Sequence, residues 1–215
     1  EGYEIAWLDA LCQSGRVAWA RLRGDPGGAE RTVATPVRAT PIVLLARRNL
    51  AHWSRYSRVA TDASALSSRA QGVADELARR GASFFDELLA GTRLLHVQLE
   101  EALAELVAAG LVNADSYAGL RALLVPAAKR ASRRRRAGRR ALFGIEDAGR
   151  WSLARRDGEA ADGAAEALEH VVRTLLRRYG VFCWRLLAQE AAWLPPWREL
   201  LRTCHRLEAR GEIRG

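Results

Sequence analysis

The stretch LAELVAAGLV at residues 103–112 contains the pattern that decides the fold of this chain. Two apolar residues stand three positions apart, a glycine follows four positions later, and a β-branched residue comes two positions after the glycine. The same spacing occurs in LDALCQSGRV at residues 8–17 and in CHRLEARGEI at residues 204–213. The chain therefore carries three copies of one structural signal.

Each part of this repeat has a physical meaning. Apolar residues at i and i+3 lie on one face of a helix. A glycine one turn later suits the left-handed residue that ends a helix, and a β-branched residue beyond it suits the start of a strand. The third helix of a winged-helix module runs into its wing in this way. We therefore predict a mainly α protein with small β wings, built from tandem winged-helix (helix-turn-helix) modules, which commonly bind nucleic acid or dock onto one another.

The net charge of +9 comes almost entirely from one segment. Residues 129–140 (KRASRRRRAGRR) hold eight cations and no anion, which leaves 26 cations (34 − 8) against 25 anions elsewhere. The rest of the chain, with a net charge of +1, is expected to form nearly neutral modules. No apolar run approaches the ~20 residues of a membrane span, and we expect no membrane association.

The ends and the cysteines of the chain suggest its context. The start lacks the basic and apolar regions of a signal peptide, and the absence of methionine indicates a fragment of a longer chain. The three cysteines form no C-x-x-C pair, so we expect reduced thiols in a cytoplasmic protein rather than a disulfide or a metal site. His52, His96, His170 and His205 show no ligand spacing, and we predict structural histidines and no metal.

Residues 1–45 are expected to cover only the end of the first module. Residues 4–14 read as its third helix, residues 16–22 as a strand, and residues 32–45 as the edge strand of a wing. Its earlier helices are expected to lie upstream of Glu1. Residues 46–65 form a connector, in which Trp53 and Tyr56 are expected to pack between modules.

The second module, over residues 66–125, shows three helices and a wing. Ser68 and Gln71 resemble a capping box, and Gly81 ends the first helix. Ser83 is expected to cap a second helix that stops at Gly91. The inward residues of the third helix are predicted to be Leu95, Leu99, Leu103, Leu106 and Val107. Residues 117–125 are predicted to form the returning strand of the wing.

Residues 126–162 read as an Arg-rich linker, whose second half is held to a neighbour by Phe143, Ile145, Trp151 and Leu153. A third module follows over residues 163–215 and is expected to be truncated in its wing. Its first helix is closed by Gly180, a short helix spans residues 182–188, and its third helix begins at Pro196 and stops at Gly211.

Two arginine groups are candidates for contact with DNA phosphates. Arg198, Arg202, Arg206 and Arg210 recur every four residues along the last helix, where they either neutralise phosphates or form a solvated surface with i, i+4 pairs. Arg133, Arg134, Arg135 and Arg136 form either a phosphate-binding tether or a plain flexible linker. Trp193 and Trp197 flank a double proline and are interpreted as core anchors rather than base-stacking groups.

The third helix of the second module has a different outer face. Gln98, Glu100, Glu101 and Glu105 are predicted to lie there, and carboxylates would repel a phosphate backbone. We therefore interpret this helix as a packing or dimerising element.

The chain shows no signature of catalysis. It lacks G-x-x-x-x-G-K-[ST], so it is not a P-loop ATPase, and it lacks G-x-S-x-G and H-E-x-x-H. No cofactor is expected in this fragment. Gln98 with Glu100, or Glu100 with Glu101, are weak candidates for base-excision residues.

Four stretches carry a resemblance to a known family: WLDALCQSGRVAWARL (7–22), ATPVRATPIVLLARRNLAHW (34–53), residues 84–112 and residues 175–215. They resemble the C-terminal extension of Lhr, the large helicase-related proteins of bacteria. The resemblance implies an array of winged-helix modules and a parent that is a superfamily-2, ATP-dependent 3′-to-5′ DNA helicase with a role in DNA repair. The motor and its ATP site would lie upstream of this fragment.

The resemblance also implies homo-oligomerisation and a relation to winged-helix DNA glycosylases that excise uracil. It assigns no catalytic residue here. The sequence is compatible with three functions: an assembly and DNA-binding region of a repair helicase, a glycosylase module that acts on uracil or a damaged base, and a plain winged-helix regulator. The regulator is disfavoured because only the third module has a suitable reading helix.

Overall fold

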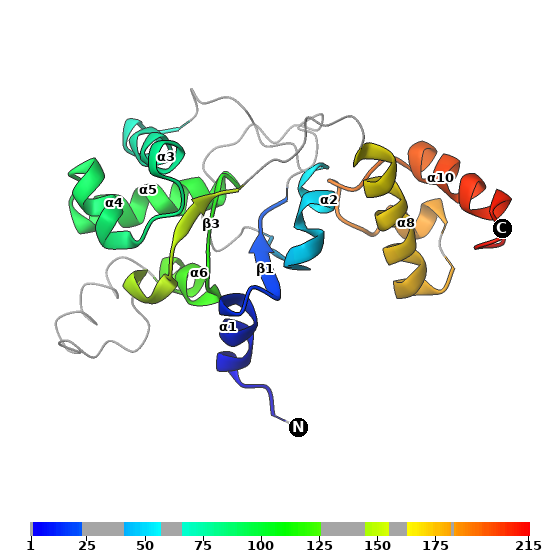
Figure 1. Cartoon of the computed structure of the whole chain (residues 1–215), viewed down its shortest axis with the longest axis horizontal. Helices are drawn as coiled ribbons and strands as arrows, with labels where there is room; N and C mark the ends of the chain where they lie inside the picture. Colours follow the sequence, from blue (N-terminus) through cyan, green and yellow to red (C-terminus); the bar gives the residue numbers. More distant parts are fainter. Residues whose placement is uncertain (1, 23–40, 57–65, 126–144, 155–162, 182) are drawn as a thin grey trace. The chain divides into compact units, whose positions relative to one another are not determined.

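A computed structural model of the chain describes residues 2–22, 41–56, 66–125, 145–154, 163–181 and 183–215 (Figure 1). Within these ranges the protein is mainly α-helical, with two small two-stranded antiparallel sheets, β1–β2 and β3–β4. This architecture confirms the predicted fold class.

The three repeats end their helices in the same way. Gly15, Gly110 and Gly211 have φ angles of 71°, 72° and 74°, in the left-handed region that glycine adopts without steric cost. In each copy the residue after the glycine donates its N–H to the carbonyl of the repeat's leucine: Arg16 to Leu11, Leu111 to Leu106 and Glu212 to Leu207. Such a bond satisfies a free carbonyl of the last helical turn. The predicted helix stop is confirmed in all three copies.

The segments after the three glycines differ. β1 (Val17–Ala20) and β3 (Val112–Ala114) begin at the β-branched residue of the repeat, as predicted. Ile213 of the third copy is not part of a strand among the described residues.

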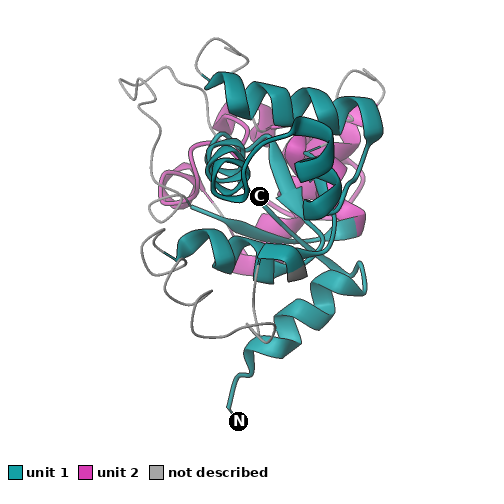
Figure 2. Cartoon of the chain, turned by 90° about the vertical axis from the view of Figure 1, so that its left-hand side faces the viewer, with its two compact units in different colours: residues 1–21, 31–47, 60–154 teal, residues 22–30, 48–59, 155–215 magenta. Residues whose placement is uncertain are grey.

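The chain divides into two compact units (Figure 2). Unit 1 comprises residues 1–21, 31–47 and 60–154, and unit 2 comprises residues 22–30, 48–59 and 155–215. Unit 1 thus contains most of the predicted first module and all of the second, and unit 2 contains the third module with much of the predicted connector.

The centre of unit 1 is a winged-helix arrangement. Helices α3 (Ser68–Arg80), α4 (Phe85–Thr92) and α5 (His96–Ala108) are followed by β3, which pairs with β4 (Trp151–Leu153). Ser83, between α3 and α4, exchanges both backbone hydrogen bonds with Trp151. The wing strands therefore continue into a short strand contact between the first two helices.

The predicted returning strand over residues 117–125 is wrong. Tyr117–Leu124 forms helix α6, because its Ala, Leu and Arg residues favour a helix and its apolar residues share one buried face. Gly119 has room for no side chain: an added Cβ would lie 2.7 Å from the Ala148 Cβ. The true returning strand is β4, 26 residues beyond Val125 at its start (151 − 125).

The interpretation of residues 126–162 as a single linker is therefore wrong for residues 145–154. Ile145 and Ala148 of the 3₁₀ helix η5 (Ile145–Ala148) and Trp151 are buried in the core of unit 1. Leu153 is half-buried against the same core, as predicted for a pinned second half, and Phe143 lies outside the described residues.

The helix ends of the second module also differ from prediction. Ser67, not Ser68, caps α3 by accepting the Ala70 N–H. Helix α4 begins after Phe84, whose N–H donates to the Glu87 carboxylate, while the Ser83 hydroxyl donates to the Gly81 carbonyl. Helix α4 continues through Gly91 and ends at Arg93, which has a φ of 56°. The predicted stop of α3 at Gly81 is confirmed.

The first module joins the same core. Helix α1 (Ile5–Gln13) runs into β1, which pairs with β2 (Val43–Ala46) in the register Val17 to Ala46. Trp19 of β1 is 1% exposed, and its indole Nε1 donates to the Ser116 carbonyl at 3.0 Å. The first two predicted modules therefore form one folded unit rather than two.

Unit 2 is a small helical domain. It consists of α2 (Leu50–Ser54, entered through the 3₁₀ helix η2, Arg47–Asn49), α8 (Ala164–Tyr179), α9 (Trp184–Leu187) and α10 (Trp197–Ala209). Trp53 of α2 is buried and packs edge-on against Trp193 and His170. Trp53 and Trp193 are thus core anchors of this unit.

The cysteines and helix lengths bear on two further predictions. All three cysteines are free: Cys12 is buried, Cys204 is half-buried and Cys183 is exposed. Across the described ranges, no helix has the length and apolar character needed to cross a membrane. The same residues show no cluster of side chains that would hold a metal ion.

Candidate nucleic-acid interface

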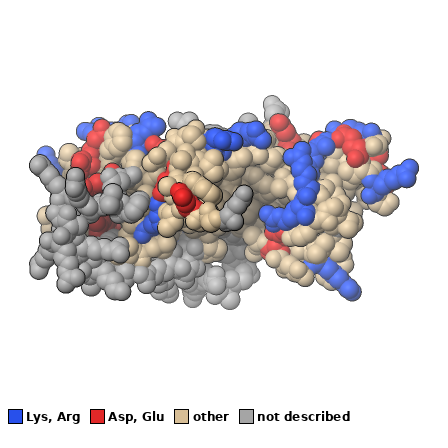
Figure 3. Space-filling model, turned by 90° about the horizontal axis from the view of Figure 1, so that it is seen from below, with Lys and Arg blue, Asp and Glu red and all other residues tan. Residues whose placement is uncertain are grey.

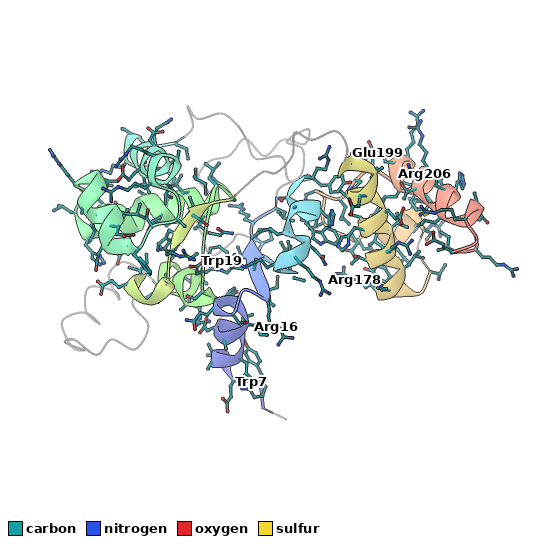
Figure 4. All side chains as sticks on the ribbon, in the orientation of Figure 1. Trp7, Arg16, Trp19, Arg178, Glu199 and Arg206 are labelled. Atoms are coloured by element: carbon teal, nitrogen blue, oxygen red, sulfur yellow. The ribbon has the colours of Figure 1, made fainter. Side chains whose placement is uncertain are left out.

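Helix α10 presents the arginine row predicted from the sequence. The helix forms because Leu200, Thr203 and Leu207, spaced three and four residues apart, bury one face against the rest of unit 2. Arg198, Arg202, Arg206 and Arg210 follow a four-residue spacing and are all exposed (Figure 4 labels Arg206). The structure therefore places the row on the solvent side of the helix.

The four arginines differ in their partners. Arg210 lies 2.6 Å from a Glu169 oxygen and 2.8 Å from a Glu212 oxygen, and Arg206 donates to the Thr203 hydroxyl at 3.0 Å. Arg198 and Arg202 make no ion pair or hydrogen bond with any side chain in the described ranges. The first half of the helix thus carries the charge that is most available to an anion.

An ion-pair network secures the other half of the row. Glu169 of α8 binds both Arg173 and Arg210, and Arg173 also pairs with Glu212. Hydrogen bonds from Arg210 and then Arg173 hold the pKa of the Glu169 carboxyl below its usual value. The hydrogen bonds that Arg173 donates, first to Glu212 and then to Glu169, raise the pKa of Arg173. The network links α8, α10 and the residues after Gly211.

A pocket of about 510 Å³ opens beside this network. Its lining comes from α2, α8 and α10: His52, Ala165, Glu166, Glu169, His170, Arg173, Arg206 and Arg210. The His52 and His170 rings stack with centroids 4.9 Å apart. Burial lowers the pKa of His170, and the electrostatic effect of His52 is the second cause. With neutral histidines, three arginines and two carboxylates leave a net charge of +1 (3 − 2). The pocket is only weakly attractive to an anion.

Charge alternates on the surface of unit 2. Figure 3 shows one face of the molecule, on which blue Lys and Arg side chains stand beside red Asp and Glu side chains, and in unit 2 Arg173 and Arg210 pair with Glu169. The surface is thus not a continuous basic patch, and the availability of individual arginines decides where a phosphate would bind.

The outer face of α5 is not the acidic surface predicted. Glu100 is 8% exposed, Glu105 accepts from the N–H and the hydroxyl of Ser67, and Gln98 accepts from the Leu95 N–H. Only Glu101 of the four is exposed. Glu105 and Gln98 thus bond to the residues that precede α3 and α5. Leu95, expected inside, is 70% exposed because it precedes the first turn of α5.

The remaining candidates divide into two groups. Arg133, Arg134, Arg135 and Arg136 lie outside the described residues. Trp193 contacts Trp53, as a core anchor would, and Trp197 is half-buried in the first turn of α10. Sequence reasoning missed Trp184 and Arg185 of α9, which are both exposed. No local signal in the sequence marks them, because their exposure depends on how the helices of unit 2 pack.

Helices α8, α9 and α10, with the open arginine row on the third, define the class of this region as a helix-turn-helix domain of the winged-helix type. The family model described as "Large helicase-related protein, winged-helix domain" matches residues 161–215. Residues 161–215 are therefore similar to the winged-helix domain of the large helicase-related protein (Lhr) family. A comparison with curated proteins gave no match.

Proposed function

We propose that this chain is the C-terminal winged-helix region of an ATP-dependent 3′-to-5′ DNA helicase of superfamily 2 that acts in DNA repair, and that unit 2 docks it onto DNA. The family match supports a helicase-associated winged-helix region. The observation that carries the DNA-binding step is the exposure of Arg198 and Arg202 without a described partner on the third helix of that domain.

Phosphate binding follows from the chemistry of these two side chains. A guanidinium is always charged and donates two parallel hydrogen bonds to phosphate oxygens. Arg198 and Arg202 lie one turn apart on the same face, so both reach one stretch of backbone. Arg206 and Arg210 are partly neutralised, and we assign them a smaller share of the binding.

A salt series on DNA binding tests this assignment. Replacing Arg198 and Arg202 by alanine is expected to reduce the slope of log affinity against log salt by about 2, because each phosphate contact releases about one counterion. The matched control replaces Arg79 and Arg80 of unit 1, two arginines that pair with Glu76. An equal loss in both variants would show general charge attraction and contradict a docking role for α10. Deletion of residues 129–140 measures the share of the Arg-rich segment separately.

We further propose that unit 1 serves homo-oligomer assembly. Helix α1 and the residue pair before it expose Tyr3, Ile5 and Trp7 at 66%, 55% and 52%, and the Tyr3 and Trp7 rings contact each other edge-on. Covering such apolar side chains with another protein surface lowers the free energy of the system. Ile5→Ser with Trp7→Ser is expected to reduce the mass measured by sedimentation at micromolar concentration. An unchanged mass would place the assembly surface elsewhere.

The glycosylase alternative gains no specific support from unit 2. Its pocket holds two carboxylates, but Glu169 is bound by two arginines that lower its pKa and so weaken it as a base. Excision on a uracil-containing strand, measured for the wild-type chain and Glu166→Gln, tests this alternative directly.

A further inference from the structure

The junction of α8 and α9 carries an exposed aromatic surface that the proposed docking of α10 does not use. Trp184 is 59% exposed, Val181 74% and Tyr179 38%. Arg178 and Arg185 accompany the two aromatic rings. We call these five residues the aromatic corner, and we propose that it binds the unpaired bases of single-stranded DNA.

The arginines of the corner are placed on the aromatic rings. The guanidinium carbon of Arg185 lies 5.5 Å from the centroid of the Trp184 ring, and that of Arg178 lies 5.9 Å from the Tyr179 ring. Both distances fall in the range of cation–π contacts. A base that stacks on such a ring brings its phosphate close to a guanidinium, so one nucleotide gains both a stacking and an ionic contact.

The Tyr179 side of the corner is held in position. Glu190 accepts hydrogen bonds from both the Arg178 guanidinium, at 2.6 Å, and the Tyr179 hydroxyl. These two bonds fix the ring and its arginine relative to the turn after α9. A stacking surface of fixed orientation loses little side-chain entropy when a base binds.

The packing of unit 2 does not account for the exposed rings. Helix α9 buries none of its side chains, although Trp184, Leu186 and Leu187 make most of it apolar. Among the described residues, the buried side chains of unit 2 come instead from α2, α8 and α10, together with Leu22 and Pro195. An exposed tryptophan of this kind marks a surface that contacts another molecule.

The charge of the corner favours a polyanion over an apolar protein surface. Residues 177–190 hold three arginines and one carboxylate, a net charge of +2 (3 − 1). An apolar partner would leave the guanidinium groups of Arg177 and Arg185 without water or a counter-charge, whereas a nucleic-acid strand supplies phosphates. Ring stacking further selects a single strand, because the bases of a duplex are already stacked on one another.

Tryptophan fluorescence tests the proposal on the 215-residue chain. Oligothymidine is expected to quench part of the emission, and Trp184→Leu is expected to remove that quenching and weaken single-strand affinity roughly 5- to 100-fold. The matched control is Phe84→Leu, which removes an aromatic ring of unit 1 that is 51% exposed and should leave affinity unchanged. Trp184→Phe should restore part of the binding, because it restores an aromatic ring.

Cys183 provides an independent measurement. It is exposed and adjacent to Trp184, while Cys12 is buried. Oligothymidine is expected to slow its reaction with a thiol reagent more than that of Cys204, and a duplex of equal length is expected to slow it less. The Arg198→Ala, Arg202→Ala variant should keep both the quenching and the protection, so a failure of α10 docking is distinguishable from a failure of the aromatic corner.

Three outcomes would overturn the proposal. The first is unchanged oligothymidine affinity in Trp184→Leu, with the melting temperature also unchanged. The second is an equal loss of duplex affinity, which would indicate general charge attraction. The third is a lower oligomeric mass in Trp184→Leu with single-strand binding intact, which would make the corner a contact between protein chains.

Discussion

Helices α5 and α10 hold the same place in their modules but are used differently. Both have 13 residues, both carry the repeat and both end at a left-handed glycine. Helix α5 buries seven side chains, including Leu99, Leu103, Leu106 and Val107, whereas α10 buries three. The difference teaches that the repeat determines how a helix ends, while the apolar content of its remaining positions determines how much of it stays open to a partner.

The polar residues of the two helices follow the same division. In α5, Glu105 fixes the start of α3 through Ser67, and Glu100 is buried. In α10, Arg198 and Arg202 extend into solvent. Glu100 and Glu105 of α5 lie within unit 1, whereas Arg198 and Arg202 of α10 are open to an anion.

The largest effect is expected from removing the repeat's leucine in each helix. Leu106 and Leu207 are both 0% exposed, so each change to alanine loses transfer free energy and leaves a cavity. We expect Leu106→Ala to cost about 4 kcal/mol and Leu207→Ala about 2.5 kcal/mol. We expect the larger cost for Leu106→Ala because the largest fully buried side chains, Trp19, Trp151 and Phe85, all lie in unit 1.

Amide hydrogen exchange measures the two costs separately, because it reports the opening of each helix on its own. Equal protection losses in α5 and α10 would mean that the two cores are equally well packed, and the comparison drawn above would fail.

A smaller effect is expected from the glycine of each repeat. A Cβ at Gly110 would lie 2.8 Å from the Arg21 carbonyl oxygen, while at Gly211 it would meet nothing within 4 Å. Both substitutions place alanine at positive φ, which costs about 1 kcal/mol. We expect Gly110→Ala to cost about 2–3 kcal/mol in total, since the clash adds to the strain, and Gly211→Ala about 1 kcal/mol. Urea unfolding of the two variants checks this order; a larger loss for Gly211→Ala would contradict it.

The repeat made much of the fold predictable from the sequence. The apolar spacing and the glycines located α1, α3, α5, α8 and α10, because each signal is local to one helix. The returning strand of the second wing was missed because its pairing with β3 is long-range. Nothing within residues 117–125 shows that Trp151 pairs with Ala114 and occupies the strand position instead.

The position of the candidate arginines on α10 was predictable from the sequence, but the ion pairs that neutralise some of them were not. A four-residue spacing places the arginines on one face, which the structure confirms for Arg198 through Arg210. It does not reveal that Glu169, 41 residues before Arg210, binds that arginine. Nor does it show that the tryptophan of the short helix α9 remains exposed, since exposure depends on how α8 and α10 meet.

The smallest effect is expected from the ion-pair network at the end of α10. The pKa of Glu169 is lowered in the folded state, so its ion pairs stabilise the fold above the unfolded pKa near 4.5 and are lost as pH falls through the lower folded pKa. At pH 7, Glu169→Gln should cost less than about 1 kcal/mol, because the pairs are partly exposed. The cost should disappear in acid. Glu166→Gln removes a carboxylate with no ion pair among the described residues and is the matched control. Thermal unfolding of both variants at pH 7 and pH 3 makes the comparison; a cost for Glu169→Gln that persists at pH 3 would mean that its packing, and not its charge, stabilises unit 2.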